Sequence, residues 1–154
     1  HQVFSTLHTN DAVSSVTRLL DMGVEDFLVT STVSGVLAQR LVRRLCMQCR
    51  EAFTPTQTYL GEVGFAPGTQ VRTLYRPVGC EACDGTGYRG RFGILELLVM
   101  NEAVRQAILA RADASGLREA AVASGMTTMY ADGLAKAAAG VTTVEEIVRV
   151  TRDA

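Results

Sequence analysis

The alternation of apolar and polar residues predicts strands and helices in turn along the first third of the chain. Residues 3–8 form an apolar run typical of a buried strand, and this run ends in a polar cluster. Apolar residues then recur at intervals of three and four, which predicts a helix that Asn10 or Asp11 caps and that Gly23 ends. A second helix is expected over about residues 25–39.

Two further strands are expected in the middle of the chain. Residues 40–45 alternate between apolar and polar side chains, as in a short strand. Residues 92–100 are mostly apolar, which is typical of a strand buried on both faces. Residues 50–79 hold all three prolines and show little helical periodicity, so we expect an irregular or β-rich excursion there.

From Asn101 onward the chain is alanine-rich and helical. Asn101 is the predicted cap of the first of these helices, and Thr143 with Glu146 predicts a capping box at the start of the last one. The apolar faces of the helices are expected to cover the core, although they can also serve as an interaction surface. Breaks between them are expected at Gly116, Gly125, Gly133 and Gly140.

Composition narrows the class of protein. With 154 residues, of which 47% are hydrophobic, the chain should form one ordinary domain or two small ones. Its net charge is −1, so neither a nucleic acid nor an anionic membrane is expected as a partner, because both favour a basic excess. No apolar run approaches the roughly 18 to 20 residues needed to span a bilayer, and no secretory leader is evident. We therefore expect a cytoplasmic protein that is not transmembrane.

The single lysine bears on nucleotide binding. A phosphate-binding loop of the Walker A type needs a lysine directly after glycine, whereas Lys136 follows Ala135. The chain also begins at His1 without an initiator methionine. If the chain serves a nucleotide-driven enzyme, we expect the phosphate-binding loop to lie upstream of residue 1.

All four cysteines lie in two C-x-x-C pairs separated by thirty residues. This spacing is typical of a structural zinc site, because each tight turn supplies two thiolates to a tetrahedral ion. Gly85 and Gly87 should let the backbone after the second pair curl so that its N–H groups face the sulfurs. Disulfides, a redox pair or free thiols are the alternatives. The predicted metal ligands are Cys46, Cys49, Cys80 and Cys83.

One histidine and several arginines are candidates for contacts with phosphate. His8 should lie at the end of a strand beside the start of a helix, where it could reach a phosphate or a metal-bound water, or act only as a packing residue. Arginine offers a planar fork of donors that suits phosphate, but exposed arginines are often simply solvated. The candidates are Arg18, Arg40, Arg43, Arg44, Arg89 and Arg91.

Several motifs along the chain carry a family resemblance. They are His1-Gln-Val-Phe-Ser-Thr-Leu-His8-Thr-Asn-Asp11 and residues 16–23, 36–46, 87–98, 132–134 and 140–151. Together they resemble the carboxy-terminal third of the type II secretion ATPases, the family called general secretion pathway protein E. The sister family, the type IV pilus assembly ATPases, shares the histidine motif and often the four cysteines, whereas the pilus retraction ATPases lack the cysteine pairs.

The resemblance implies a fold and an activity. It implies an α/β fold: the carboxy-terminal part of a RecA-like P-loop ATPase core over residues 1–45, an inserted tetracysteine zinc-binding subdomain over 46–90, and a last core strand with a helical tail over 91–154. It also implies a homo-hexamer that hydrolyses ATP with Mg²⁺ to drive pseudopilus assembly. Such a motor is cytoplasmic, peripheral to the bacterial inner membrane, and bound to inner-membrane components of the secretion system.

The resemblance also implies roles for single residues. His1 and His8 match the family's histidine box, with His8 near the γ-phosphate or the attacking water. Arg18 and Arg91 match arginines that act across subunit boundaries on a neighbour's nucleotide. The four cysteines match a structural zinc site that can form a docking surface for membrane proteins. Walker A, the aspartate box and the Walker B acid are absent from this sequence, so the fragment alone should be inactive. A zinc-stabilised docking module with no nucleotide role is the alternative.

Overall fold

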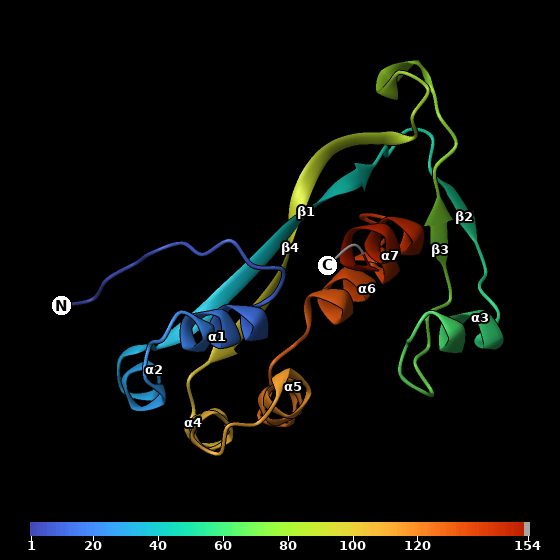
Figure 1. Cartoon of the computed structure of the whole chain (residues 1–154). Coiled ribbons are helices and arrows are strands. Elements are labelled where there is room, and N and C mark those ends of the chain that lie inside the picture. The colour runs from blue at the N-terminus through green and yellow to red at the C-terminus, as the bar shows by residue number, and fades with distance from the viewer. Residues whose placement is uncertain (153–154) are drawn as a thin grey trace. The chain divides into compact units, whose positions relative to one another are not determined.

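The structure, a computed structural model, describes residues 1–152 (Figure 1). Helices and strands are mixed along these residues, as predicted. The helices are α1 (Ala12–Asp21), α2 (Asp26–Thr32), α3 (Gln57–Glu62), α4 (Glu102–Leu109), α5 (Ala114–Ala123), α6 (Met129–Ala138), α7 (Val144–Arg152) and a 3-10 turn over Glu81–Cys83. The strands are β1 (Gly35–Leu45), β2 (Glu51–Phe53), β3 (Leu74–Arg76) and β4 (Tyr88–Val99).

The chain packs as two compact units, which are described separately. The first unit comprises His1–Gln39 and Leu95–Met129, and the second comprises Arg40–Ile94 and the segment from Tyr130. The long strands β1 and β4 pair with each other and continue from one unit into the other. The predicted segments 1–45 and 91–154 each contribute residues to both units, whereas 46–90 lies within the second. The assignment of a function to each of the three segments stays a prediction.

The first unit is built around α1. Asp11 caps this helix as expected, since its side chain accepts a hydrogen bond from the Ser14 amide at 2.6 Å. Gly23 follows the helix with a φ of +87°, in the left-handed region that favours glycine, so the predicted end of the helix is confirmed. The buried core of this unit comprises Ala12, Val13, Val16, Val29, Leu98, Met100, Val104, Ile108, Leu117, Ala121 and Met126.

The predicted strand over residues 3–8 is wrong. Residues 1–9 adopt neither helix nor strand, and Val3 and Phe4 are 81% and 88% exposed. A strand is stable only when a neighbour pairs with its backbone and covers its apolar side chains, and no described segment does so for this run. Apolar composition alone therefore did not determine its conformation.

The predicted helix over residues 25–39 is half right. α2 ends at Thr32, and Gly35 begins the strand β1, which then continues through the predicted strand over residues 40–45. The Met100 amide donates to the Ser34 carbonyl at 3.0 Å, and the Cys46 amide donates to the Gly87 carbonyl at 2.9 Å. These bonds lie at opposite ends of the β1–β4 pair, so β1 runs antiparallel to β4. Pairing with β4 thus outweighs the helical periodicity of residues 33–39.

β4 is a strand, as predicted, but it is not buried on both faces. Ile94, Glu96 and Leu98 are buried, whereas Leu95 and Leu97 between them are 40% and 52% exposed. The strand therefore alternates between a buried and an exposed face, with a carboxylate among the buried positions.

The second unit combines a small sheet with helices. β2 and β3 pair antiparallel, with Ala52 opposite Tyr75, which agrees with the β-rich excursion expected between the cysteine pairs. The helix α3 in the same excursion was not predicted; Thr56 caps it by accepting from the Tyr59 amide at 3.1 Å. The buried core of this unit comprises Leu60, Leu74, Leu134, Ala137 and Val144.

The helical tail follows the prediction in part. Asn101 caps α4, and Gly125 and Gly140 lie between helices with positive φ, as expected. Gly116 and Gly133 lie inside α5 and α6 and do not interrupt them, so these two predicted breaks are wrong. A glycine costs a helix interior only about 1 kcal/mol, which packing readily offsets.

Candidate metal centre

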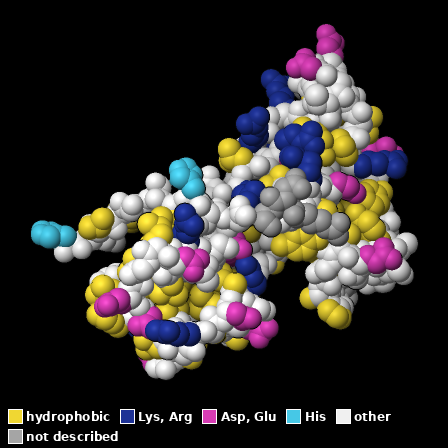
Figure 2. All heavy atoms as spheres, viewed as in Figure 1, with side chains coloured by type: hydrophobic (Ala, Val, Ile, Leu, Met, Phe, Trp, Pro, Cys, Tyr) yellow, Lys and Arg dark blue, Asp and Glu magenta, His cyan; other side chains and the backbone are white. Residues whose placement is uncertain are grey.

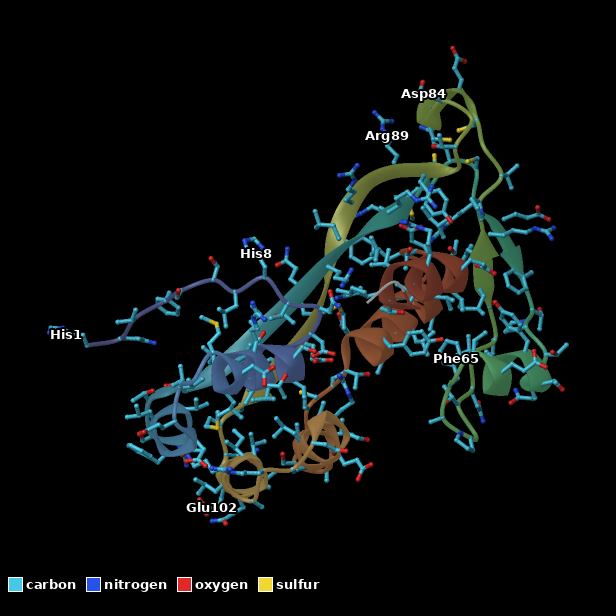
Figure 3. All side chains as sticks on the ribbon, viewed as in Figure 1. His1, His8, Phe65, Asp84, Arg89 and Glu102 are labelled. Atoms are coloured by element: carbon cyan, nitrogen blue, oxygen red, sulfur yellow. The ribbon has the colours of Figure 1, made fainter. Side chains whose placement is uncertain are left out.

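The four cysteine sulfurs converge at one point of the second unit (Figure 3, close to Asp84). All four Sγ atoms lie within 4.8 Å of one another. The sulfurs of Cys46 and Cys80, of Cys49 and Cys83, and of Cys80 and Cys83 are each 3.8 Å apart. We call this group the cysteine cluster. The predicted convergence of the two C-x-x-C pairs is confirmed, and their role as metal ligands stays a prediction.

The spacing of the sulfurs fits a tetrahedral ion. A tetrahedron with metal–sulfur bonds of about 2.3 Å has edges of about 3.8 Å, which matches these three sulfur–sulfur distances. A disulfide would need sulfurs about 2.05 Å apart, and all four cysteines are free thiols. The donor set of four sulfurs, with Cys46 and Cys83 buried, is therefore suited to zinc or iron rather than to calcium or magnesium.

Backbone amides donate hydrogen bonds to the sulfurs of the cluster. The Gly79 amide donates to the Cys49 sulfur at 3.3 Å, and the Cys80 and Gly87 amides both donate to the Cys83 sulfur at 3.2 Å. Burial in itself raises the pKa of the Cys83 thiol, but these two N–H donors, together with hydrogen bonds from the Cys49 and Cys80 thiols, outweigh it and lower the pKa to about 6. Cys83 is thus prepared to bind a metal as a thiolate.

Glycines allow the turn that places these amides. Gly85 and Gly87 both have a φ of +75°, in the region that favours glycine, as the sequence predicted. A Cβ atom at Gly87 would also collide with Pro77, so the two chain segments of the cluster approach more closely than any other residue would allow.

A buried carboxylate anchors the end of β1 near the cluster. Glu146 on α7 has a fully buried side chain that accepts hydrogen bonds from the guanidinium groups of Arg43 and Arg149. Burial alone would raise the pKa of Glu146, but the bonds from Arg149 and Arg43 outweigh it and lower the pKa to about 2. Half of the predicted capping box is present, since the Glu146 amide donates to the Thr143 hydroxyl at 3.1 Å. The carboxylate itself binds the arginines instead.

A small cavity beside this anchor is lined by two of the six candidate arginines. It has a volume of about 220 Å³, and Arg43, Tyr88 and Arg91 line it. The guanidinium of Arg43 lies 4.1 Å from the centre of the Tyr88 ring, a cation–π geometry. Arg91 is exposed on β4 and has no carboxylate within salt-bridge distance in residues 1–152.

The remaining predicted site residues belong to the first unit. His1 and His8 are exposed in the segment before α1 (Figure 3), and Arg18 is exposed on α1. No ion pair joins these three side chains to any other side chain within the described part of the chain. Their predicted roles at a nucleotide stay predictions.

A buried carboxylate of the first unit was missed in the sequence. Glu96 is 2% exposed and accepts hydrogen bonds from the Ala12 amide at 3.1 Å and the Met129 amide at 3.0 Å. Arg118 on α5 binds Asp11 at 2.5 Å and approaches Glu96 at 3.9 Å. The sequence feature that could have revealed Glu96 is its place as the single acid in the apolar run of residues 94–99. The group ties the segment that follows His8 to β4 and α5.

Within residues 1–152, none of the helices has the length and apolar character that a bilayer crossing requires.

The chain is similar to known secretion and pilus assembly proteins over nearly all of its length. The family model described as type II/IV secretion system protein matches residues 1–149. The chain is 52% identical over 154 residues, all of its length, to the type II secretion system protein HxcR of Pseudomonas aeruginosa. It is 46% identical over 152 residues, 98% of its length, to the type IV pilus assembly ATPase PilB of Thermus thermophilus. It is 42% identical over 153 residues, 99% of its length, to the type II secretion system ATPase E of Vibrio cholerae.

The match covers nearly all of this chain but only a part of each relative. The chain spans 29% of HxcR, 17% of PilB and 30% of the Vibrio cholerae protein. Because the family model covers 149 of 154 residues, the chain belongs to the type II/IV secretion system protein family.

Proposed function

We propose that this chain is the carboxy-terminal part of a hexameric cytoplasmic ATPase with a RecA-like core. The motor couples ATP hydrolysis to pseudopilus assembly and protein export through a type II secretion system, at the face of the inner membrane. The observation that carries the proposal is the alignment with a relative named as a type II secretion system ATPase, which covers 99% of the chain at 42% identity. The full-length protein, rather than this chain alone, is the ATP hydrolase, and it binds ATP and Mg²⁺.

The cysteine cluster is proposed to hold a structural zinc ion. An ion bound by four thiolates has no open position for a substrate, so it stabilises the fold and takes no part in the reaction. Its role is to fasten both ends of residues 50–79 to each other and offset the loss of chain entropy when this loop closes. The amides of Gly79 and Gly87, which donate to the sulfurs of Cys49 and Cys83, support this assignment.

His8, His1, Arg18 and Arg91 are proposed to act at the nucleotide. In phosphoryl transfer the protein contributes mainly by positioning groups and by stabilising charge. His8 would hold the γ-phosphate or the attacking water by a hydrogen bond, and His1 would assist nucleotide binding. Arg18 and Arg91 would stabilise negative charge on the phosphoryl group bound to a neighbouring subunit. The exposure of all four side chains is consistent with contacts to groups outside this chain.

A type IV pilus assembly ATPase is a second candidate. The 46% identity to PilB favours it, because this value lies within the range found for the secretion proteins, 42 to 52%. Complementation separates the two: the gene should restore protein export, and not pilus assembly, in a strain that lacks its own motor.

The experiment that tests the nucleotide role uses the full-length protein with His8→Ala. We expect ATP hydrolysis to fall much more than ATP affinity, because His8 acts on the transferred group rather than on the base or ribose. An equal loss of hydrolysis and binding would assign His8 to packing. Unchanged hydrolysis in both His8→Ala and Arg91→Ala would favour the third candidate, a docking module with no nucleotide role.

A further inference from the structure

The residues directly after His8 are held in place by hydrogen bonds. The hydroxyl groups of Thr9 and Ser15 lie 2.5 Å apart, and they lie 3.3 and 3.1 Å from the Asp11 carbonyl oxygen. Figure 2 shows the histidine side chains, in cyan, at the surface of the described residues. Consecutive Cα atoms are about 3.8 Å apart, so the position of Thr9 determines which groups His8 can reach.

Arg118 binds this segment from a different helix. Its Nη2 atom lies 2.5 Å from Oδ2 of Asp11, whereas Oδ1 of the same carboxylate accepts from the Ser14 amide at 2.6 Å. Burial alone raises the pKa of Asp11, but the hydrogen bonds from Ser14 and Arg118 outweigh it and lower the pKa. The carboxylate is therefore ionised at neutral pH, and it is bound both by the start of α1 and by α5.

A second carboxylate faces the same guanidinium. Nη1 of Arg118 lies 3.9 Å from Oε2 of Glu96, and Oε1 of Glu96 accepts from the Ala12 amide at 3.1 Å. Asp11 and Ala12 are consecutive residues, so one guanidinium serves both carboxylates that hold this short segment. A planar fork of donors suits such a bridge better than the single ammonium of lysine.

The bridge matters more for placement than for folding. The Arg118 side chain is 37% exposed, and ion pairs with a partly exposed member contribute little to stability. By contrast, a displacement of about 1 Å in a reacting group can lower a rate by about a hundredfold. A side chain that fixes residues 9–12 therefore affects a reaction at His8 far more than it affects folding.

We propose that Arg118 is a positioning residue for His8. Its bridge between Asp11 and Glu96 holds the backbone after His8 where the histidine reaches the transferred phosphoryl group or the attacking water. The inference rests on the proposed role of His8 at the nucleotide. Arg118 acts through this backbone and makes no contact of its own with the nucleotide.

The test is steady-state ATP hydrolysis by the full-length protein with Arg118→Ala and Arg118→Lys. We expect Arg118→Ala to lower kcat by about tenfold or more and to change KM for ATP by less than about threefold, because the side chain does not bind ATP. Arg118→Lys should recover part of the loss, since an ammonium still pairs with Asp11.

The matched control is Arg105→Ala. Arg105 is another arginine on a helix of the first unit, and its Nε donates to the Thr30 carbonyl at 3.0 Å, so its loss also removes a structural hydrogen bond. We expect kcat of this variant to change by less than about twofold, since Thr30 lies outside the segment that follows His8. Hydrogen exchange over residues 9–14 should quicken in Arg118→Ala and stay unchanged in the control.

A combination with His8→Ala separates positioning from general damage. In that background Arg118→Ala should cause no further loss of kcat, because no histidine is left to position. An equal further loss would overturn the proposal and assign Arg118 to the nucleotide itself or to folding. Faster exchange over residues 9–14 with kcat unchanged would overturn it as well.

The same data distinguish this inference from the proposed function. A fall in hydrolysis with His8→Ala but not with Arg118→Ala would overturn the positioning role alone and leave the role of His8 intact. Unchanged hydrolysis with His8→Ala would overturn the proposed function of His8, and the positioning role with it.

Discussion

The carboxylate of Glu146 and the guanidinium of Arg43 form a two-point contact, with Nε at 3.0 Å and Nη2 at 2.8 Å from the same oxygen. The Arg43 amide also donates to the other oxygen at 3.0 Å. Because side chain and backbone of one residue bind the same carboxylate, the position of β1 relative to α7 within the second unit is closely fixed. Charged hydrogen bonds of this kind are stronger than neutral ones.

Removal of this carboxylate should destabilise the protein strongly. Glu146→Ala leaves the Arg43 amide without its acceptor and removes the partner of two half-exposed guanidinium groups, which should cost about 1 to 3 kcal/mol. Urea unfolding followed by circular dichroism measures the loss. The matched control is Glu145→Ala on the same helix, whose exposed side chain accepts only from the Tyr59 hydroxyl at 3.2 Å. A control that loses as much stability as Glu146→Ala would contradict the assignment.

The lowered pKa of Glu146 predicts a defined dependence of stability on pH. The unfolded chain binds a proton at the ordinary value of 4.5, whereas the folded protein does so at about 2. The carboxylate therefore contributes its full stabilisation above pH 4.5, and the contribution disappears as the pH falls to 2. It amounts to on the order of 3 kcal/mol. Glu146→Gln should remove this part of the dependence of the unfolding free energy on pH. Since release of the proposed metal at acid pH would affect both proteins, the difference between them isolates Glu146.

The cysteine cluster predicts about one zinc ion per chain. Protein purified without added metal should contain it, as measured by mass spectrometry of the metal content. A strong chelator, or Cys83→Ser, should make residues 46–91 sensitive to protease, because the ion fastens both ends of the excursion. The first unit should stay resistant, since its core contains none of these cysteines. Protein without metal and with unchanged protease resistance would contradict the structural role, and iron would contradict the identity of the ion.

Two glycines inside helices should respond in opposite ways to alanine. A Cβ atom at Gly133 would lie 2.7 Å from Cγ2 of Ile147, whereas at Gly116 its nearest neighbours are 3.4 Å away. Gly133→Ala should therefore cost about 1 to 3 kcal/mol through overpacking. Gly116→Ala should be neutral or stabilising by up to about 1 kcal/mol, because alanine favours the helix. Equal melting temperatures for the two variants would show that Ile147 moves aside without cost.

Glu96 predicts a loss of stability in the first unit. Glu96→Ala leaves the amides of Ala12 and Met129 without acceptors, which should cost on the order of 3 kcal/mol. Hydrogen exchange should quicken most at these two amides. Glu119→Ala, an exposed acid on α5, is the control and should change stability by less than about 0.5 kcal/mol. Unchanged exchange at Ala12 in the Glu96 variant would contradict the bonding described.

The features that could be predicted from the sequence depend on local chemistry. The cap at Asp11 and the left-handed glycines after α1 and after Cys83 follow from a few neighbouring residues. The convergence of the two distant C-x-x-C pairs could be predicted because each pair is a local motif that supplies two ligands to one tetrahedral ion. The failures concern residues 3–8 and 33–39, where the conformation depends on a pairing partner distant in sequence. Periodicity cannot detect whether such a partner is present.

The missed site residues share one property. Glu96, Glu146 and Arg118 have partners 33 to 107 positions away, among them the Met129 amide and Asp11. In sequence, Glu146 fits a capping box and Arg118 a solvated helix face. Their roles become visible only after the fold brings the partners together. Glu96 could have been found, because a lone acid at an inward position of an apolar strand needs compensation.

Glu96 also helps to fix the register of β4. A slip of one position along β4 would turn this acid toward solvent and set Leu97, which offers no acceptor, against the amide groups of Ala12 and Met129. Misaligned pairings of β1 with β4 would thus lose two buried hydrogen bonds at once. A single acidic residue in an otherwise apolar stretch of β4 thus favours one register of the β1–β4 pair, whereas leucine at this position would be compatible with several.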